Sequence, residues 1–245
     1  QKTAYEIYQC DWSSDVCSSD LEKTLKAANV KVLPRENGTD KTTDWKAVLT
    51  KIKGKKPDAV FYGGMDATGG PLLKQARELG IKAMFAFGDG SCTAEMAKLA
   101  GTAAEGLLCS QAGIPVEAAD AKFLAAYKAK FDNVEPILYS PFTYDATQLL
   151  IAAMQKADSA DPAKYLPILA SIAHRGATGT IAFDEKGDRK DAEMTIFTMQ
   201  AGKITALAVI KSGQTIPIAE FMKMAAPAPE PTATPSTPAP EANKK

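Results

Sequence analysis

The chain has 245 residues, and its 29 Lys and Arg balance its 29 Asp and Glu, so the formal net charge is zero. A chain without a basic excess gives no reason to expect a polyanionic partner, and we expect no nucleic acid as a ligand. We also expect no transmembrane helix, because no run of about 18 apolar residues occurs.

The first residues, 1–21, differ from the rest of the chain. They show neither a helical nor a strand period. Their segments QKTAYEI and DWSSDVCSSDL match, in one reading frame, the translated constant parts of a common short-read sequencing adapter. We therefore expect an artefactual leader, not native protein, and exclude it from the fold. The alternative is an acidic, Ser-rich leader with a bridge between Cys10 and Cys17.

Regular elements are expected from residue 22 onward. A helix should end near Ala28, and a strand should follow at Val30–Leu33. A helix is expected from about Asp44 to Lys53, with Thr43 as its cap, on the i, i+3, i+4, i+7 spacing of Trp45, Val48, Leu49 and Ile52. This spacing makes Trp45 a core residue. A stacking platform for a ligand is the less favoured alternative.

A strand–helix–strand unit forms the centre of the prediction. Asp58–Tyr62 and Ile81–Phe87 are apolar runs typical of buried strands, and Ala67–Leu79 has the apolar spacing of a helix. Glycine-bearing loops follow both strands, at Gly63–Asp66 and Gly88–Ser91. Ligands of open parallel sheets bind outside the carboxyl ends of the strands, so we expect these two loops to lie side by side and to form the site.

The rest of the chain departs from regular alternation after a helix at 93–99 and a strand at 105–110. Strand and helix alternate up to that point, which indicates a parallel sheet with helices on both faces. The later elements are a crossing at 111–116, helices at 117–132, 141–156 and 161–172, a strand at 180–183 and a hairpin of 194–200 with 204–210. Pro167 should delay or kink the third helix, and the Pro- and Ala-rich residues 226–245 should be an unstructured tail.

Cys92 and Cys109 are the cysteines outside the leader. Two widely spaced cysteines without histidine ligands do not make a zinc site. A disulfide and two free thiols both remain open, and a disulfide would indicate an oxidising compartment.

Five motifs together resemble one family. They are PDAVFYGG, GPLLKQARELGIK, FGDG, LAGTAAEGLL and GTIAFDEKGD, within residues 22–210. The chain is similar to a type I periplasmic solute-binding protein of the branched-chain amino-acid (leucine/isoleucine/valine) family. The resemblance implies an α/β, two-lobe, parallel-sheet fold of the periplasmic binding protein type I, truncated and lacking most of its first lobe.

The resemblance also implies how the chain divides between the lobes. Residues 22–110 would belong to the second lobe, residues 111–183 would return to the first, and residues 184–225 would rejoin the second. The helices of the returning part would normally pack on the missing sheet, so their apolar faces should be exposed.

The same resemblance implies a set of ligand contacts. Asp89 matches the acidic residue that pairs a ligand's ammonium group, where the best-known members carry Glu. Met65 and Tyr139 match aromatic contacts, and the loop residues Gly64, Asp66 and Gly90 complete the expected ligand-binding set. The alternatives are Asp89 as a turn former, Asp66 as a helix N-cap and Tyr139 as ordinary core.

We expect the intact protein to be the substrate-binding component of an ABC importer, a periplasmic monomer without cofactor. It would capture a branched-chain or related small amino acid and deliver it to an inner-membrane permease. A binder of amides, urea or aromatic acids, or an extracellular sensory domain, are the alternatives. We do not expect an enzyme, because His174, expected at a helix end, has no acid partner placed for it. The run Asp184–Asp188 lacks the spacing of a calcium loop, so we expect a solvated turn there.

Overall fold

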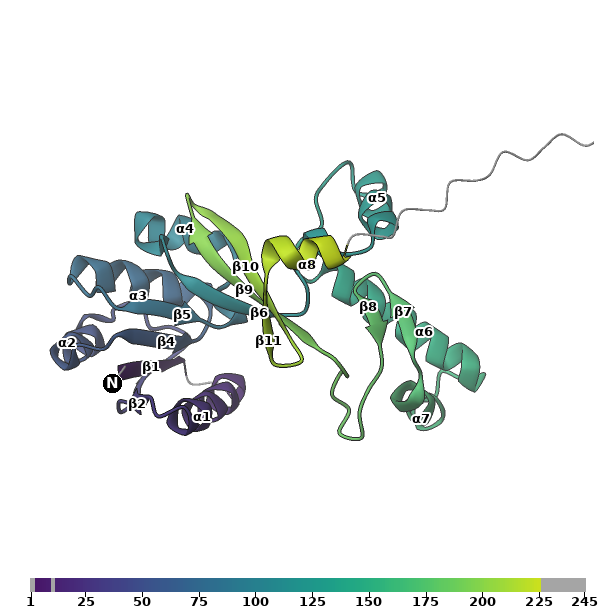
Figure 1. Cartoon of the computed structure of the whole chain (residues 1–245), viewed down its shortest axis with the longest axis horizontal. Coiled ribbons are helices and arrows are strands. Elements are labelled where there is room, and N and C mark those ends of the chain that lie inside the picture. The colour runs from purple at the N-terminus through teal and green to yellow at the C-terminus, as the bar shows by residue number, and fades with distance from the viewer. Residues whose placement is uncertain (1–2, 10–11, 226–245) are drawn as a thin grey trace, which may run out of the picture.

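A computed structural model of the chain describes residues 3–9 and 12–225, and the side chains of residues 20–225. Its main body is one mixed sheet of nine strands, with α6, α7 and a small hairpin lying apart from that sheet at the opposite end of the molecule (Figure 1). The strands of the sheet follow the order β11-β10-β9-β6-β5-β4-β1-β2, and β3 also pairs with β1.

The strands from β1 to β6 pair in parallel, whereas β9, β10 and β11 are antiparallel to their neighbours. The parallel part confirms the expected α/β fold, and the predicted hairpin of 194–200 with 204–210 forms β9 and β10, which join the sheet in antiparallel pairing. The strands of the sheet are β1 (Thr3–Gln9), β2 (Lys31–Val32), β3 (Glu36–Gly38), β4 (Ala59–Gly63), β5 (Met84–Phe87), β6 (Leu108–Ala112), β9 (Glu193–Gln200), β10 (Lys203–Lys211) and β11 (Gln214–Pro217).

The helices beside this sheet are α1 (Trp12–Ala27), α2 (Lys46–Lys55), α3 (Asp66–Glu78), α4 (Ala94–Ala100) and α8 (Ile218–Ala225). The helices beyond the sheet are α5 (Ala121–Lys130), α6 (Ser140–Ala157) and α7 (Pro162–Ser171), and the two-stranded hairpin consists of β7 (His174–Gly176) and β8 (Gly179–Ile181). None of the helices within the described residues is long and apolar enough to cross a membrane.

The beginning of the chain differs from its prediction. Residues 1–21 carry no regular period, yet β1 pairs in parallel with β4 over five residue pairs and α1 begins at Trp12. The sheet edge explains the strand: the outer side of β4 presents backbone donors and acceptors that any extended segment can satisfy. The structure therefore has regular elements in a segment that the sequence prediction leaves out of the fold. The adapter origin of the segment stays a prediction.

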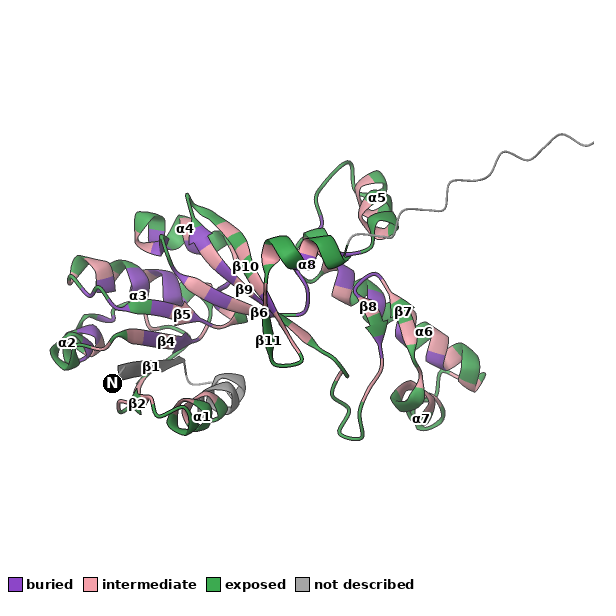
Figure 2. Cartoon of the chain, in the orientation of Figure 1, coloured by how far each residue is buried: buried purple, intermediate pink, exposed green. Residues whose placement is uncertain are grey.

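The core of the main body lies between the sheet and α2, α3 and α4, where Figure 2 shows the buried residues gathered. Trp45 is fully buried, and its indole Nε1 donates a hydrogen bond to the carbonyl of Thr68 at 3.0 Å. It is a core residue, as its spacing predicts.

Thr43 does not cap α2. Its carbonyl accepts a hydrogen bond from Gln75 Nε2, while Asp44 Oδ1 accepts one from the backbone N–H of Lys46.

Three further elements differ from their predictions. α7 begins at Pro162 and continues past Pro167 to Ser171, so Pro167 does not delay its start; the carbonyl that loses its helical partner, on Ala163, lies at the exposed surface. His174 opens β7, three residues after α7 ends, and is therefore not a helix-terminal residue. In the main sheet, the short strand β3 (Glu36–Gly38) has no counterpart in the prediction. The predicted tail, 226–245, lies outside the described residues.

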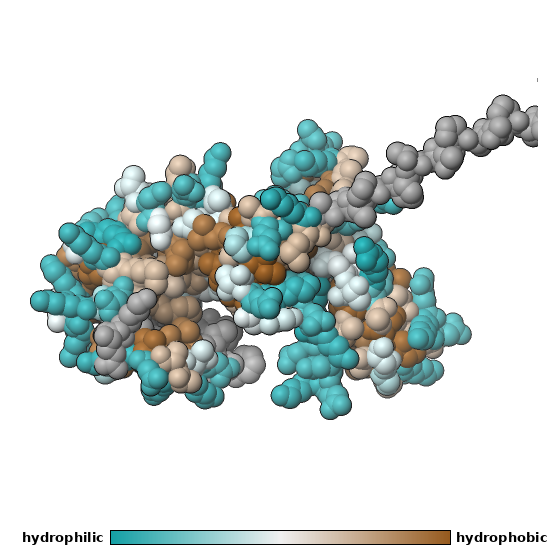
Figure 3. Space-filling view, viewed as in Figure 1, coloured by the Kyte–Doolittle hydropathy of each residue, from teal (hydrophilic) through white to brown (hydrophobic). Residues whose placement is uncertain are grey.

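Large apolar side chains are exposed on the helices beyond the sheet, as the sequence predicts. Figure 3 shows brown apolar surface among α6 and α7, and the exposed side chains in this region include Val134, Ile137, Leu150, Ile151 and Leu166.

The buried carboxylate of Asp145 on α6 holds the β7–β8 turn. It accepts the backbone N–H groups of Ala177 at 2.6 Å and Thr178 at 2.7 Å.

We predict that Trp45→Ala lowers the free energy of unfolding by about 3–5 kcal/mol, because it opens a cavity and removes the hydrogen bond from the indole to the Thr68 carbonyl. Urea unfolding followed by circular dichroism measures this change. The matched control is Leu207→Ala at a half-exposed position of β10, which should change stability by about 0.5 kcal/mol or less. Equal effects of both substitutions would contradict the assignment of Trp45 to the core.

Candidate ligand-binding site

Two loops leave the same edge of the sheet side by side. β4 and β5 pair in parallel with Tyr62 opposite Phe87, so the chain segments that follow them start next to each other. The first segment passes through Gly64 and Met65 into α3, and the second passes through Gly88 into a 3₁₀ turn, η1 (Asp89–Ser91). The structure thus brings together the two loops that the sequence predicts as neighbours.

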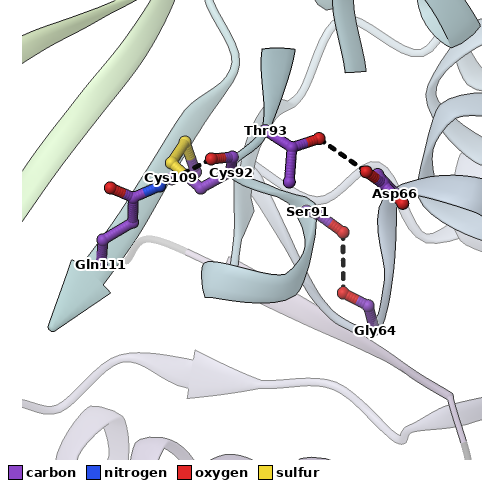
Figure 4. Close-up of a disulfide and its surroundings, with 7 residues drawn as sticks. All are labelled: Gly64, Asp66, Ser91, Cys92, Thr93, Cys109 and Gln111. Atoms are coloured by element: carbon purple, nitrogen blue, oxygen red, sulfur yellow. Dashed lines mark hydrogen bonds between the residues drawn. A yellow bond between two sulfur atoms is a disulfide. The ribbon is translucent and has the colours of Figure 1, made fainter. Parts of the chain in front are cut away.

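One side chain–backbone and one side chain–side chain hydrogen bond join the two loops. Ser91 Oγ donates to the carbonyl of Gly64 at 2.7 Å, and Thr93 Oγ1 donates to Asp66 Oδ2 at 2.6 Å (Figure 4). The loops also touch at Gly90, where an added Cβ would lie 2.6 Å from Met65 Sδ. A side chain at position 90 would displace the flexible Met65 side chain, so Gly90 leaves the space that Met65 occupies beside the second loop.

Asp89 lies at the exposed start of η1. Its carboxylate makes no hydrogen bond or ion pair with residues 20–225, whose side chains the structure describes. The turn itself is closed by backbone, since the N–H of Cys92 donates to the carbonyl of Asp89 at 2.9 Å. The Asp89 carboxylate is therefore not required as a turn former and can accept a cationic group from solution.

Tyr139 lies within electrostatic reach of Asp89 although 50 positions separate them in the sequence. Burial first, and the negative charge of Asp89 second, raise the pKa of Tyr139 above its ordinary value. Tyr139 precedes α6 as its N-cap residue and is 54% exposed, so it is not the ordinary core residue of the alternative interpretation. The carboxylate of Asp89 and the phenol of Tyr139 are therefore near enough for the charge of one to influence the other.

Asp66 and Met65 have different roles at this edge. Asp66 is the first residue of α3, whereas Met65 holds the N-cap position without a side-chain cap, so the N-cap interpretation of Asp66 is wrong. The Asp66 carboxylate is occupied by Thr93 and lies in the first helical turn, where a negative charge is favoured. Met65 is 50% exposed and offers an apolar, adaptable surface beside Gly90.

The second loop is also held from its far side. Cys92, one residue after η1, forms a disulfide with Cys109 in β6, which is one of the two alternatives that the sequence leaves open. Gln111 Nε2 donates to the carbonyl of Cys92 at 2.6 Å (Figure 4). Sequence analysis missed Ser91, Thr93 and Gln111 as individual contacts. The sequence signal that could have identified Ser91 and Thr93 is their position within three residues of the Gly88–Asp89–Gly90 turn.

A hollow of about 720 Å³ lies elsewhere, between α5, α6 and β7. Its aromatic wall consists of Phe123, Tyr127, Phe131 and Tyr144, and none of the predicted ligand-binding residues lines it.

Within the described residues no group of three or more His, Cys, Asp or Glu is placed to hold a metal ion. Asp184 Oδ1 accepts the backbone N–H groups of Lys186 and Asp188, which closes a turn.

A family model described as periplasmic binding protein matches residues 1–203. Among curated proteins, the chain is 30% identical over 197 residues to a leucine-, isoleucine-, valine-, threonine- and alanine-binding protein of Pseudomonas aeruginosa, covering 80% of this chain and 52% of that protein. It is 28% identical to a Leu/Ile/Val-binding protein homologue of Brucella abortus, over 76% of this chain and 50% of that one. The chain spans about half the length of the curated relatives it matches.

Solved structures show the same similarity. A leucine-binding protein of Thermotoga maritima superposes with a TM-score of 0.76 at 26% identity, covering 86% of this chain and 61% of that chain. A branched-chain amino-acid substrate-binding protein of Streptococcus pneumoniae in complex with isoleucine gives 0.70 at 26% identity, covering 85% and 60%. A solute-binding protein of Rhodopseudomonas palustris in complex with benzoate gives 0.71 at 16% identity, covering 89% and 61%, a likeness that shows the fold alone.

We predict that Asp89→Asn lowers the pKa of Tyr139 without returning it to the ordinary value. The substitution removes the nearby negative charge that disfavours tyrosinate, while the larger effect of burial remains. The ¹³Cζ resonance of Tyr139 followed from neutral to alkaline pH measures the change. Asp40→Asn, on an exposed loop, is the matched control and should leave this pKa where it is. An unchanged Tyr139 pKa in Asp89→Asn would show that the two side chains do not face each other.

Proposed function

Because the chain belongs to the periplasmic binding protein family, we propose that it carries part of the site at which a substrate-binding component of an ABC importer captures a branched-chain or related small amino acid. The exposed Asp89 carboxylate, which no residue of 20–225 pairs, lies at the joined ends of β4 and β5 and is the observation that supports this function most. The proposal assigns the site to binding and not to catalysis.

The chemistry of a zwitterionic amino acid fits the side chains at this edge. Its ammonium group needs an anion, and Asp89 is an exposed carboxylate that nothing described on the chain neutralises. A charge-assisted hydrogen bond of this type contributes about 1.5–3 kcal/mol. Its aliphatic side chain needs an apolar wall, for which Met65 and Tyr139 are half-exposed and available. Gly64 and Gly90 are half-buried beside these side chains, and we include their backbone in the proposed site.

The charge of Asp89 also favours an amino acid over an aromatic acid. A benzoate-like ligand has a carboxylate and no ammonium group, so Asp89 would repel it. The benzoate complex of the Rhodopseudomonas palustris protein establishes that the fold accommodates such ligands, and its low identity carries no ligand to this chain. An amino acid is therefore the ligand class that we propose, in agreement with the names of the relatives.

Two separate parts of the chain contribute to the site. Asp89 and Met65 belong to the sheet, whereas Tyr139 precedes α6, beyond the crossing that follows β6. A ligand that touches both parts at once favours the arrangement in which they approach each other. We propose that this closure presents the loaded protein to an inner-membrane permease, in the periplasm and as a monomer, and that the lobes divide near residues 110 and 183.

We predict that leucine, isoleucine or valine gives saturable shifts of the amide resonances of Gly64, Asp89 and Gly90 when titrated into the chain. Asp89→Asn should weaken the binding about ten- to a hundredfold, because it removes the partner of the ammonium group. Two-dimensional ¹⁵N NMR suits this measurement, since it detects weak complexes residue by residue. Benzoate should produce no saturable shift at these positions.

The matched control is Glu78→Gln, which removes one negative charge at the exposed end of α3 and should bind as the unsubstituted chain does. The proposal fails if none of the three amino acids shifts these resonances. It also fails if Asp89→Asn and Glu78→Gln bind with equal affinity.

A further inference from the structure

The Asp89 loop is tied to β6 by two links of different chemistry. The Cys92–Cys109 disulfide joins the residue after η1 to the second residue of β6, with 5.4 Å between the Cα atoms. Gln111, two residues further along β6, donates from Nε2 to the carbonyl of the same Cys92. Both cysteines and Gln111 are buried, so this connection lies inside the protein and not at its surface.

The end of β6 is fixed to β9 and packs against α6, the helix that directly follows Tyr139. Gly113 directly follows β6 at a φ of +92°, its carbonyl accepts Thr195 Oγ1 at 2.7 Å, and its N–H donates to the carbonyl of Glu193 in β9. An added Cβ at Gly113 would collide with the ring of Phe142 on α6. Phe142 lies three residues after Tyr139, on the same turn of the chain.

These contacts form a continuous path from one side of the site to the other. The path starts at Asp89, crosses the disulfide and Gln111 into β6, reaches Gly113 and ends through Phe142 at Tyr139. The bonds from Ser91 to Gly64 and from Thr93 to Asp66 fix the loop only against the β4 side. These two bonds to the β4 side do not determine the distance between Asp89 and Tyr139.

We propose that Cys92, Cys109 and Gln111 are positioning residues that hold the Asp89 loop at the distance from Tyr139 that the ligand requires. The inference rests on the proposed function, because it concerns the affinity of that same site. A covalent link across 17 residues of sequence removes open conformations of the loop, and the Gln111 bond removes others. Loss of either link should loosen the loop locally and weaken ligand capture.

The test compares two variants by two measurements. The double variant Cys92→Ala, Cys109→Ala removes the disulfide without leaving a free thiol, and Gln111→Leu removes the hydrogen bond alone. Amide hydrogen exchange of residues 89–92 should become at least about tenfold faster in each variant. The dissociation constant for leucine, measured by amide shift titration, should rise at least about fivefold in each.

Leu49→Ala is the control for a general loss of stability, because Leu49 is a fully buried residue of α2 with no contact in this path. It should lower the unfolding midpoint while leaving the exchange of residues 89–92 and the affinity for leucine unchanged. If Leu49→Ala changes both readouts as much as the two variants do, the effect is one of stability and the inference is wrong.

The two measurements separate this inference from the proposed function. Unchanged exchange of residues 89–92 in both variants overturns the inference, as does faster exchange with an unchanged affinity for leucine. Should the unsubstituted chain not bind leucine at all, the proposed function fails, and the positioning role for that ligand fails with it. Faster exchange in that case would show only that the links restrain the loop. If the double variant does not fold, Gln111→Leu alone decides.

Discussion

The site depends on the close approach of two loops at the carboxyl ends of β4 and β5. The hydrogen bond from Ser91 Oγ to the carbonyl of Gly64 holds them together, and Gly90 leaves the space that the Met65 side chain occupies between them. Parallel pairing of the two strands brings the loops to one edge, and this bond joins them there. The loop is held by neighbouring groups, and Asp89 stays exposed without a hydrogen bond or ion pair to residues 20–225.

The arrangement separates the groups that hold the site from the groups offered to a ligand. The holding groups donate hydrogen bonds to other groups of the protein, as the side chains of Ser91, Thr93 and Gln111 do. Asp89 and Tyr139 remain exposed, and the negative charge of Asp89 contributes to the raised pKa of Tyr139. A binding site that must release its ligand benefits from this division, because ligand entry then breaks no bond that the loops need.

The sequence predicts the parts of this site that local pattern determines. Buried apolar runs and an amphipathic stripe identify β4, α3 and β5, and glycines after the strands identify the loops. It does not predict that Thr93 would occupy Asp66, because that bond depends on how side chains 27 positions apart are oriented after folding. The run of β1 has no clear strand period, and it is recruited by the edge of β4. Pro167 does not delay the start of α7, because the carbonyl that it leaves without a helical partner, on Ala163, is exposed to solvent.

A crystal structure of the chain grown with leucine would test the central claim most directly. The account predicts the ammonium nitrogen within hydrogen-bonding distance of the Asp89 carboxylate, and the isobutyl group against Met65 and Tyr139. Leucine bound in the aromatic hollow between α5 and α6, with Asp89 turned to solvent, would contradict it.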